Sequence, residues 1–272
     1  MGYSWKDGII LKLANIVVYF VFLGSNIRSI SFYDSVGGKL TYITPAPWSF
    51  LIWSLIHFLL LGPIVYQFTE NGHRTIIEGI SWRFPFVAVL NALYVHAWTR
   101  GYLITAFILS LFVSSVISHI YYIVKKHHEP SNTWDELCVH LPFSLWHGWA
   151  TALVVLSAFT AFGVDASEYR AGVWTCVFVI LALIFLGCTA TAYAFSSPEG
   201  DLPASVVITW YLWAVFVQQW NVPILRWMVL AIAVHASLWV GSCVVAVVAK
   251  IRRGRQAILL DEEREPFAEE DA

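Results

Sequence analysis

The feature that most constrains this chain is a series of long apolar stretches separated by short polar segments. Of its 272 residues, 58% are hydrophobic and only 12% are charged, and the mean hydropathy is +0.67. A helix needs about 20 apolar residues to cross a bilayer, and a backbone in lipid must satisfy its own hydrogen bonds. The sequence therefore predicts an all-α, polytopic transmembrane helical bundle with about eight spans, and it excludes soluble domains.

The limits of the spans follow from the polar residues between the apolar runs. We predict spans over 8–30, 47–68, 80–98, 101–124, 141–162, 172–195, 202–218 and 222–249. The first run has no small-residue cleavage site behind it, because Arg28 and an aromatic pair follow. We therefore expect a retained helix rather than a signal peptide.

Lysine and arginine residues predict the orientation, because positively charged loops stay in the cytosol. If both termini are cytosolic, most of the 16 Lys and Arg residues fall in cytosolic segments. The exceptions are Arg28, Lys39, Arg100, Arg170 and Arg226. We therefore predict an integral, multi-pass membrane protein with both termini in the cytosol, although the sequence does not indicate which membrane. The basic cluster 250–255 would anchor the last span or meet anionic lipid headgroups.

The polar residues inside the predicted spans restrict the chemistry. Every Asp and Glu is expected in a loop or tail, which disfavours acidic proton relays and enzymes that need a buried carboxylate. The polar groups that remain in the spans are His57, His96, His119, His147, His235 and Asn91. Such residues usually form hydrogen bonds between helices. Haem ligation by two facing histidines is the alternative.

The 14 tryptophans divide into two groups. Those near the ends of spans are expected to anchor the chain at the membrane interface, whereas Trp53, Trp146 and Trp149 lie deeper. Trp146 and Trp149 are three residues apart and share a helix face, as do Phe50 and Trp53. Two such faces could stack on a flat hydrophobic ligand. Aromatic packing between helices explains the same pattern equally well.

Three segments resemble signature segments of the translocator protein / tryptophan-rich sensory protein (TspO/MBR-like) family. They are "PAPWSF" at the start of the second span, "LNALY" in the third and "LPFSLWHGWATAL" at the start of the fifth. The order and spacing of the three segments agree with the family. This chain departs from the pattern at Trp53, which follows Phe50 one position early, at Tyr94, which replaces a tryptophan, and at Val154, which replaces an asparagine.

The resemblance covers about residues 8–165 and implies a five-helix membrane core over 1–165. We expect three additional transmembrane helices over 166–250 and a charged, disordered cytosolic tail over 251–272. The resemblance also implies an aromatic pocket, roofed by the first loop, that takes tetrapyrroles, sterols or terpenoid-like molecules. With His57 added from the second span, the predicted ligand-binding residues are Trp48, Phe50, Trp53, His57, Asn91, Tyr94, Phe143, Trp146 and Trp149.

Three functions remain open on the sequence. The first is a binding protein for a hydrophobic, planar ligand with a sensing or transport role. The second is a membrane carrier of a small hydrophobic molecule. The third is a membrane-embedded enzyme that acts on a lipid or terpenoid with His57, His96 or His147 as base. Enzymatic activity, catalytic residues and cofactors are therefore left unassigned.

The expected partners are the lipid bilayer and the small-molecule ligand. A net charge of −2 indicates no nucleic acid. The small residues Gly241, Ser242 and Ala246 permit a homodimer, or equally packing within the chain. No metal is expected. The His and acidic residues of 125–140 lack a metal-ligand spacing, and we expect this segment to be a solvated loop.

Overall fold

The computed structural model describes residues 4–31, 39–197, 200–218 and 222–270, without the side chains of 28–31 and 254–270. These residues form helices and no strands. The long helices are α1 (Ile9–Ser31), α2 (Ile52–Tyr66), α4 (Arg83–Thr99), α5 (Leu103–His127), α7 (Leu141–Phe162), α8 (Val173–Ala194), α9 (Leu202–Gln218) and α10 (Pro223–Glu270). The short ones are the 3-10 helix η1 (Pro47–Leu51), α3 (Glu70–Gly72), the π-helix η2 (His73–Ile80), α6 (Thr133–Asp135) and the π-helix η3 (Glu136–His140).

Each of the eight predicted spans overlaps one of the long helices, so the all-helical, multi-pass architecture is confirmed. Within the described chain, however, only six helices are long and apolar enough to cross a membrane, or seven if the bent pair η2 and α4 counts as one span. Helix α2 has only 15 residues but forms a span of 20 together with η1, whereas α4 and α9 have 17 residues each. For α4 and α9 the length matters. At 1.5 Å per residue they extend roughly 26 Å, less than a hydrocarbon core of about 30 Å. Eight full-length spans are therefore not observed.

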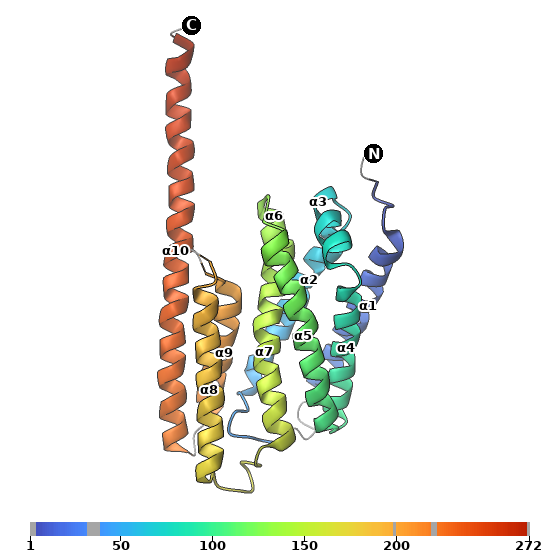
Figure 1. Cartoon of the computed structure of the whole chain (residues 1–272), viewed down its shortest axis with the longest axis vertical. Helices are drawn as coiled ribbons and strands as arrows, with labels where there is room; N and C mark the ends of the chain where they lie inside the picture. Colours follow the sequence, from blue (N-terminus) through green and yellow to red (C-terminus); the bar gives the residue numbers. More distant parts are fainter. Residues whose placement is uncertain (1–3, 32–38, 198–199, 219–221, 271–272) are drawn as a thin grey trace.

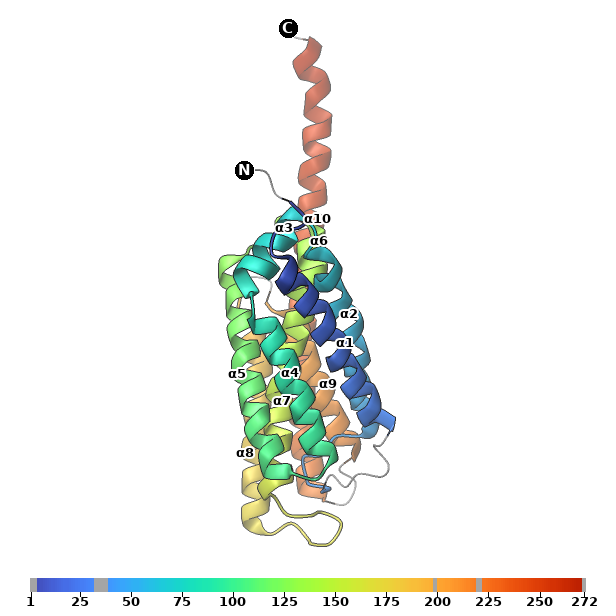
Figure 2. The ribbon, with the colours of Figure 1, turned by 90° about the vertical axis from the view of Figure 1, so that its right-hand side faces the viewer.

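Five helices form a closed ring in which each packs against the next. The order around the ring is α1, α2, α7, α5 and α4, and α4 returns to α1. The remaining long helices lie outside this ring. Helix α9 packs against α7 on one side and against α8 and α10 on the other, and α8 also packs against α10 (Figures 1 and 2). Helix α9 therefore joins the outer helices to the ring.

A glycine allows α7 and α9 to approach closely. A Cβ atom at Gly148 would lie 2.8 Å from the carbonyl oxygen of Ala204 and 2.9 Å from a methyl carbon of Val207. Small residues of this kind let helix backbones approach one another where lipid provides no hydrophobic driving force. The contact accounts in part for the burial of α7, the most buried of the long helices.

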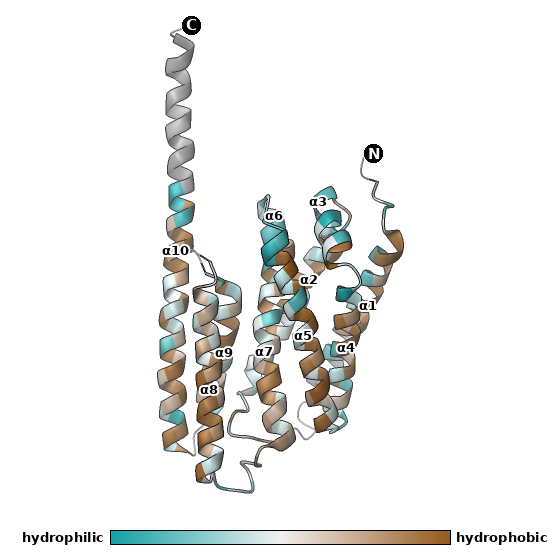
Figure 3. Cartoon of the chain, in the orientation of Figure 1, coloured by the Kyte–Doolittle hydropathy of each residue, from teal (hydrophilic) through white to brown (hydrophobic). Residues whose placement is uncertain are grey.

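Helix α1 begins at the end of the bundle where α10 leaves it, and α10 continues well beyond the other helices (Figure 1). The central parts of the helices consist mainly of hydrophobic residues (Figure 3). Hydrophilic residues gather on α3 and α6, at the end of the bundle where α1 begins. Over 251–270 the backbone of α10 is helical. The disordered tail expected over 251–272 stays a prediction, and 271–272 lie outside the described residues.

The segment expected to be a solvated loop over 125–140 is partly buried and helical. The side chain of Asn132 caps α6 by accepting a hydrogen bond from the backbone N–H of Asp135 at 2.9 Å. Asp135 is buried and accepts a hydrogen bond from the hydroxyl of Tyr66 in α2 at 2.5 Å. His140 is also buried. Most of 125–134 is exposed, as expected for a solvated loop, and only the end of the segment departs from that expectation. Asp135 can be buried because the Asn132 cap and the bond from Tyr66 provide polar partners away from water.

Candidate functional site

Aromatic side chains from several helices meet inside the ring of five helices. Phe22 in α1 stacks on Trp146 in α7 with ring centroids 5.0 Å apart, and its ring lies 4.4 Å from the imidazole of His57 in α2. Trp53 stacks on the same imidazole at 5.7 Å. We refer to this group and its ring neighbours as the aromatic cluster: Tyr19, Phe22, Phe50, Trp53, His57, Trp146, Trp149 and Tyr211.

Trp149 extends the aromatic cluster toward the outer helices. Its indole lies 5.7 Å from the ring of Phe50 in η1 and 6.1 Å from the ring of Tyr211 in α9, both as edge contacts. Trp53 is a third neighbour at 6.4 Å. Edge-to-face and stacked pairs of this kind each contribute about 0.5–1.5 kcal/mol beyond burial of their area. The cluster thus continues from α1 through α2 and α7 to α9.

Helical periodicity brings these rings together. In α1 the buried residues Asn15, Tyr19, Phe22 and Asn26 follow one another at steps of four, three and four, which places them on one face. In the same way Trp53 and His57 share a face of α2. Proline stands at the start of η1 and in the first turn of α7, where a missing N–H costs no helical hydrogen bond. The local sequence therefore orients the cluster with ordinary helical geometry.

Several buried polar atoms of the site have no hydrogen-bond partner among the described residues. They are both ring nitrogens of His57, both amide atoms of Asn91 and the indole nitrogens of Trp146 and Trp149. The four side chains are between 0% and 4% exposed. A buried polar group without a partner costs about 1–3 kcal/mol. Packing of rings alone does not account for retaining so many unpaired groups.

The structure brings together five of the nine predicted site residues. Phe50, Trp53, His57, Trp146 and Trp149 belong to the aromatic cluster. Asn91 is fully buried in α4, one turn from Tyr94.

The other predicted residues form separate contacts. Trp48 meets Trp210 of α9 edge-on at 4.6 Å, and Phe143 meets Phe84 at 6.2 Å. Tyr94 accepts a hydrogen bond from Ser157 at 3.3 Å.

Sequence reasoning missed three members of the aromatic cluster. Tyr19 and Phe22 could have been found, because they lie on the same face of the first span as two asparagines. Tyr211 offers no such signal: it lies in α9, outside the region covered by the three signature segments.

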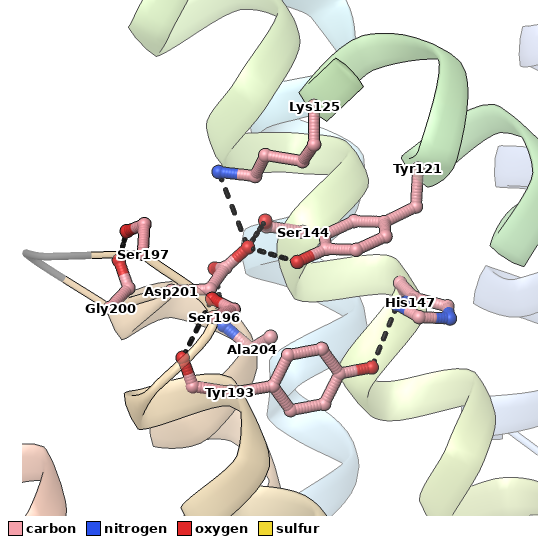
Figure 4. A network of polar contacts seen from close by, with 10 residues as sticks. All are labelled: Tyr121, Lys125, Ser144, His147, Tyr193, Ser196, Ser197, Gly200, Asp201 and Ala204. Atoms are coloured by element: carbon pink, nitrogen blue, oxygen red, sulfur yellow. Dashed lines mark hydrogen bonds and ion pairs between the residues drawn. The ribbon is translucent and has the colours of Figure 1, made fainter.

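A second polar site lies between the ring of five helices and α9 (Figure 4). Asp201 immediately precedes α9 and is only 2% exposed. Its carboxylate accepts hydrogen bonds from the hydroxyls of Tyr121 at 2.7 Å and Ser144 at 2.6 Å, and the ammonium of Lys125 lies 3.2 Å away. Asp201 is outside the helices, as expected for every acidic residue. Unlike an ordinary loop carboxylate, however, it is buried and fully engaged.

The turn before α9 explains why this loop residue is buried. Gly200 has a φ of +73°, a conformation that glycine adopts without steric cost. A Cβ atom there would lie 2.6 Å from the sulfur of Cys243 and 2.7 Å from the carbonyl oxygen of Ala194. The turn directs the next residue, Asp201, back toward α5 and α7.

The histidines expected to connect helices have different environments. His147 contacts the hydroxyl of Ser118 at 2.8 Å through Nε2 and that of Tyr193 at 2.7 Å through Nδ1, so the hydrogen-bonding role is confirmed for this residue. His96, His119 and His235 are exposed on the bundle surface. Within the described part of the chain, no group of three or more His, Cys, Asp or Glu side chains is placed to hold a metal ion.

A family model described as TSPO-like protein matches residues 9–244. No curated protein and no solved structure matches the chain. The matched range includes all members of the aromatic cluster and also α8, α9 and the first part of α10, which the three signature segments did not reach.

The Asp201 site predicts a specific loss of stability. Replacing Asp201 with Ala removes the acceptor of two hydroxyls and the partner of Lys125, so the variant should lose about 1.5–3 kcal/mol of unfolding free energy. Asp201→Asn keeps an acceptor oxygen and should lose less. Unfolding in detergent, followed by far-ultraviolet circular dichroism, measures both, with Asp165→Ala in the loop 163–172 as the control. Equal stability of Asp201→Ala and the control would contradict the assignment.

Proposed function

The chain belongs to the TSPO-like protein family, and from this membership we propose that it binds a hydrophobic, planar ligand at the aromatic cluster. The ligand is of the tetrapyrrole, sterol or terpenoid class, and the role is sensing or transport. The observation that carries the proposal is the group of buried, unpaired polar atoms on His57, Trp146 and Trp149 of the aromatic cluster and on Asn91 in α4.

The ring geometry supports a flat ligand. Phe22 and Trp146 lie nearly parallel, with 19° between their planes, and Trp53 and His57 lie at 30°. Parallel faces accept another flat molecule more readily than edges do, because a stacked ligand keeps contact over its whole face. These two pairs come from three different helices and are in contact with each other, with the rings of Phe22 and His57 4.4 Å apart, so a flat ligand would stack on them by separating these rings.

The unpaired atoms indicate a ligand with polar groups at its edge. The indole nitrogens of Trp146 and Trp149 can only donate, whereas the side chains of His57 and Asn91 can both donate and accept. A hydrocarbon without polar atoms would leave all of them unpaired. A ligand with oxygen or nitrogen acceptors would satisfy the donors in surroundings without competing water, where hydrogen bonds are strongest.

The assignment of individual residues follows from their positions. We assign ligand contact to Phe50, Trp53, His57, Trp146 and Trp149, and a hydrogen bond to Asn91. Trp48, Tyr94 and Phe143 support neighbouring rings. Rigid helix starts at Pro47 and Pro142 reduce the ordering cost of binding, because the tryptophans that follow are already held in place.

Native mass spectrometry of gently purified protein tests the proposal, followed by titration with a tetrapyrrole and with a sterol. Trp146→Leu and Trp53→Leu should each weaken binding about tenfold or more, because each removes a stacking face. Trp174→Leu is the matched control, since Trp174 on α8 is 74% exposed. Unchanged affinity in both cluster variants would refute the site. Flux of the bound molecule in proteoliposomes would separate transport from sensing.

Asn91→Leu gives a second, sharper test. Because neither amide atom has a partner within the described chain, an apolar side chain of similar size should leave ligand-free stability unchanged or raise it by up to about 1–3 kcal/mol. The same variant should bind the ligand more weakly. Asn15→Leu is the control and should be destabilised, since the Asn15 amide donates to Gln67 at 2.9 Å. Loss of stability in Asn91→Leu comparable to that in Asn15→Leu would show that Asn91 is structural.

We also propose that all eight long helices cross the membrane, with both termini in the cytosol. The alternating course of the helices and the common end of α1 and α10 support an even number of crossings (Figure 1). Single cysteines at Ser4 and Glu168 in a cysteine-free background test this with a membrane-impermeant maleimide on intact cells. Glu168→Cys should be labelled at once, and Ser4→Cys only after permeabilisation. The reverse pattern would invert the topology.

A further inference from the structure

Helix α9 makes three hydrogen bonds with the segment 43–49, which includes the first three residues of η1. The hydroxyl of Tyr211 donates to the carbonyl oxygen of Ile43 at 2.7 Å. The backbone N–H of Ala46 donates to the carbonyl oxygen of Ala214 at 3.0 Å. The indole N–H of Trp210 donates to the carbonyl oxygen of Ser49 at 3.0 Å. Three bonds along seven residues attach this stretch of backbone to α9, in addition to the bond that the backbone N–H of Ile52 in α2 donates to the carbonyl oxygen of Ser49.

The same segment and the same helix both contact the aromatic cluster. Phe50, directly after the segment, lies against Trp149, and Tyr211 lies against the same indole. Ile43, Ser49 and Tyr211 are fully buried. One residue, Tyr211, therefore contacts a ring of the proposed ligand site and also fixes the backbone that continues into that site.

Helix α9 is held firmly enough to act as a support. At its start, Asp201 is bonded to Tyr121 and Ser144 of the ring (Figure 4). Near its first turns, Ala204 and Val207 pack directly on Gly148 of α7. Its final turns carry the three bonds to 43–49. Movement of this segment away from the cluster therefore requires breaking bonds to a helix that is itself anchored to α7 and α5.

We propose that α9 determines how long the ligand stays bound, by holding 43–50 against the aromatic cluster, with Tyr211 and Trp210 as positioning residues. This inference rests on the proposed function. It assigns a role to the outer helices: α9 is a wall of the ligand site, and α8 and α10 support its opposite side. Release of the ligand is accompanied by opening of 43–49, and the strength of the three bonds limits the rate.

Tyr211→Phe tests the role of the bond to Ile43, because it removes the hydroxyl and keeps the ring beside Trp149. Hydrogen–deuterium exchange on ligand-free protein should show 43–50 exchanging about tenfold faster, the effect of losing one buried hydrogen bond. Dissociation of free-base protoporphyrin, followed by tryptophan fluorescence, should accelerate by a similar factor while the association rate does not fall. Trp210→Phe removes a bond from a more exposed ring and should act in the same direction if Tyr211→Phe does not fold.

The matched control is Tyr193→Phe, which removes a hydroxyl bonded to His147 and leaves 43–49 untouched. It should change neither measurement. Unchanged exchange in both α9 variants would overturn the inference, as would faster exchange with unchanged dissociation. If the wild-type protein binds no porphyrin, the proposed function fails for this ligand class and the claim about ligand retention falls with it. The exchange data would still show separately whether α9 holds the segment.

Discussion

Lipid provides no hydrogen-bond partner, so each polar atom inside this bundle needs one from the chain or from something bound to it. Most buried polar side chains meet this requirement within the chain. The amide of Gln67 bonds to Asn15 and to the carbonyl oxygen of Ile64, the hydroxyl of Tyr19 bonds to the backbone of His57, and the carboxylate of Asp201 has four partners. Against this background the unpaired nitrogens of His57, Trp146 and Trp149 stand apart, because they lie in one cluster rather than at scattered positions.

The same requirement explains how two short helices are accommodated. Helices α4 and α9 are too short to cross the hydrocarbon core comfortably, and a short helix would expose its end groups to lipid if it stood alone. At the start of α9, the carboxylate of Asp201 accepts a bond from the backbone N–H of Ala204 at 3.3 Å. Farther along α9, the carbonyl oxygen of Ala214 accepts a further hydrogen bond from the backbone N–H of Ala46. The contact of Asp201 that ties α9 to the five-helix ring thus also satisfies a group in its first turn.

Periodicity and composition predict which segments are helical, because apolar run length is a local property that needs no knowledge of neighbours. The inward faces of the second and fifth spans are also readable, since Trp53 and Trp146 sit at helical spacing within the signature segments. The residues that pack against those faces cannot be read from the sequence. Tyr211 and Trp149 are far apart in sequence, and only the fold brings their rings together. The burial of Asp201 cannot be predicted from the sequence either, because it depends on a glycine turn and on hydroxyls from two other helices.

Helix α7 combines both kinds of polar environment on its two sides. Ser144, His147 and Thr151 recur at steps of three and four and form one face, and the first two bond to residues before α9 or in α5 and α8. Trp146, Trp149 and Leu153 recur at the same steps on another face, where the indole nitrogens have no partner in the described chain. Because a helix is rigid across this short distance, the fully bonded face fixes the rotation of α7 about its axis. That rotation holds the two indoles toward the aromatic cluster. The outer helices therefore stabilise the site, although among them only α9 contributes a ring to the aromatic cluster as defined.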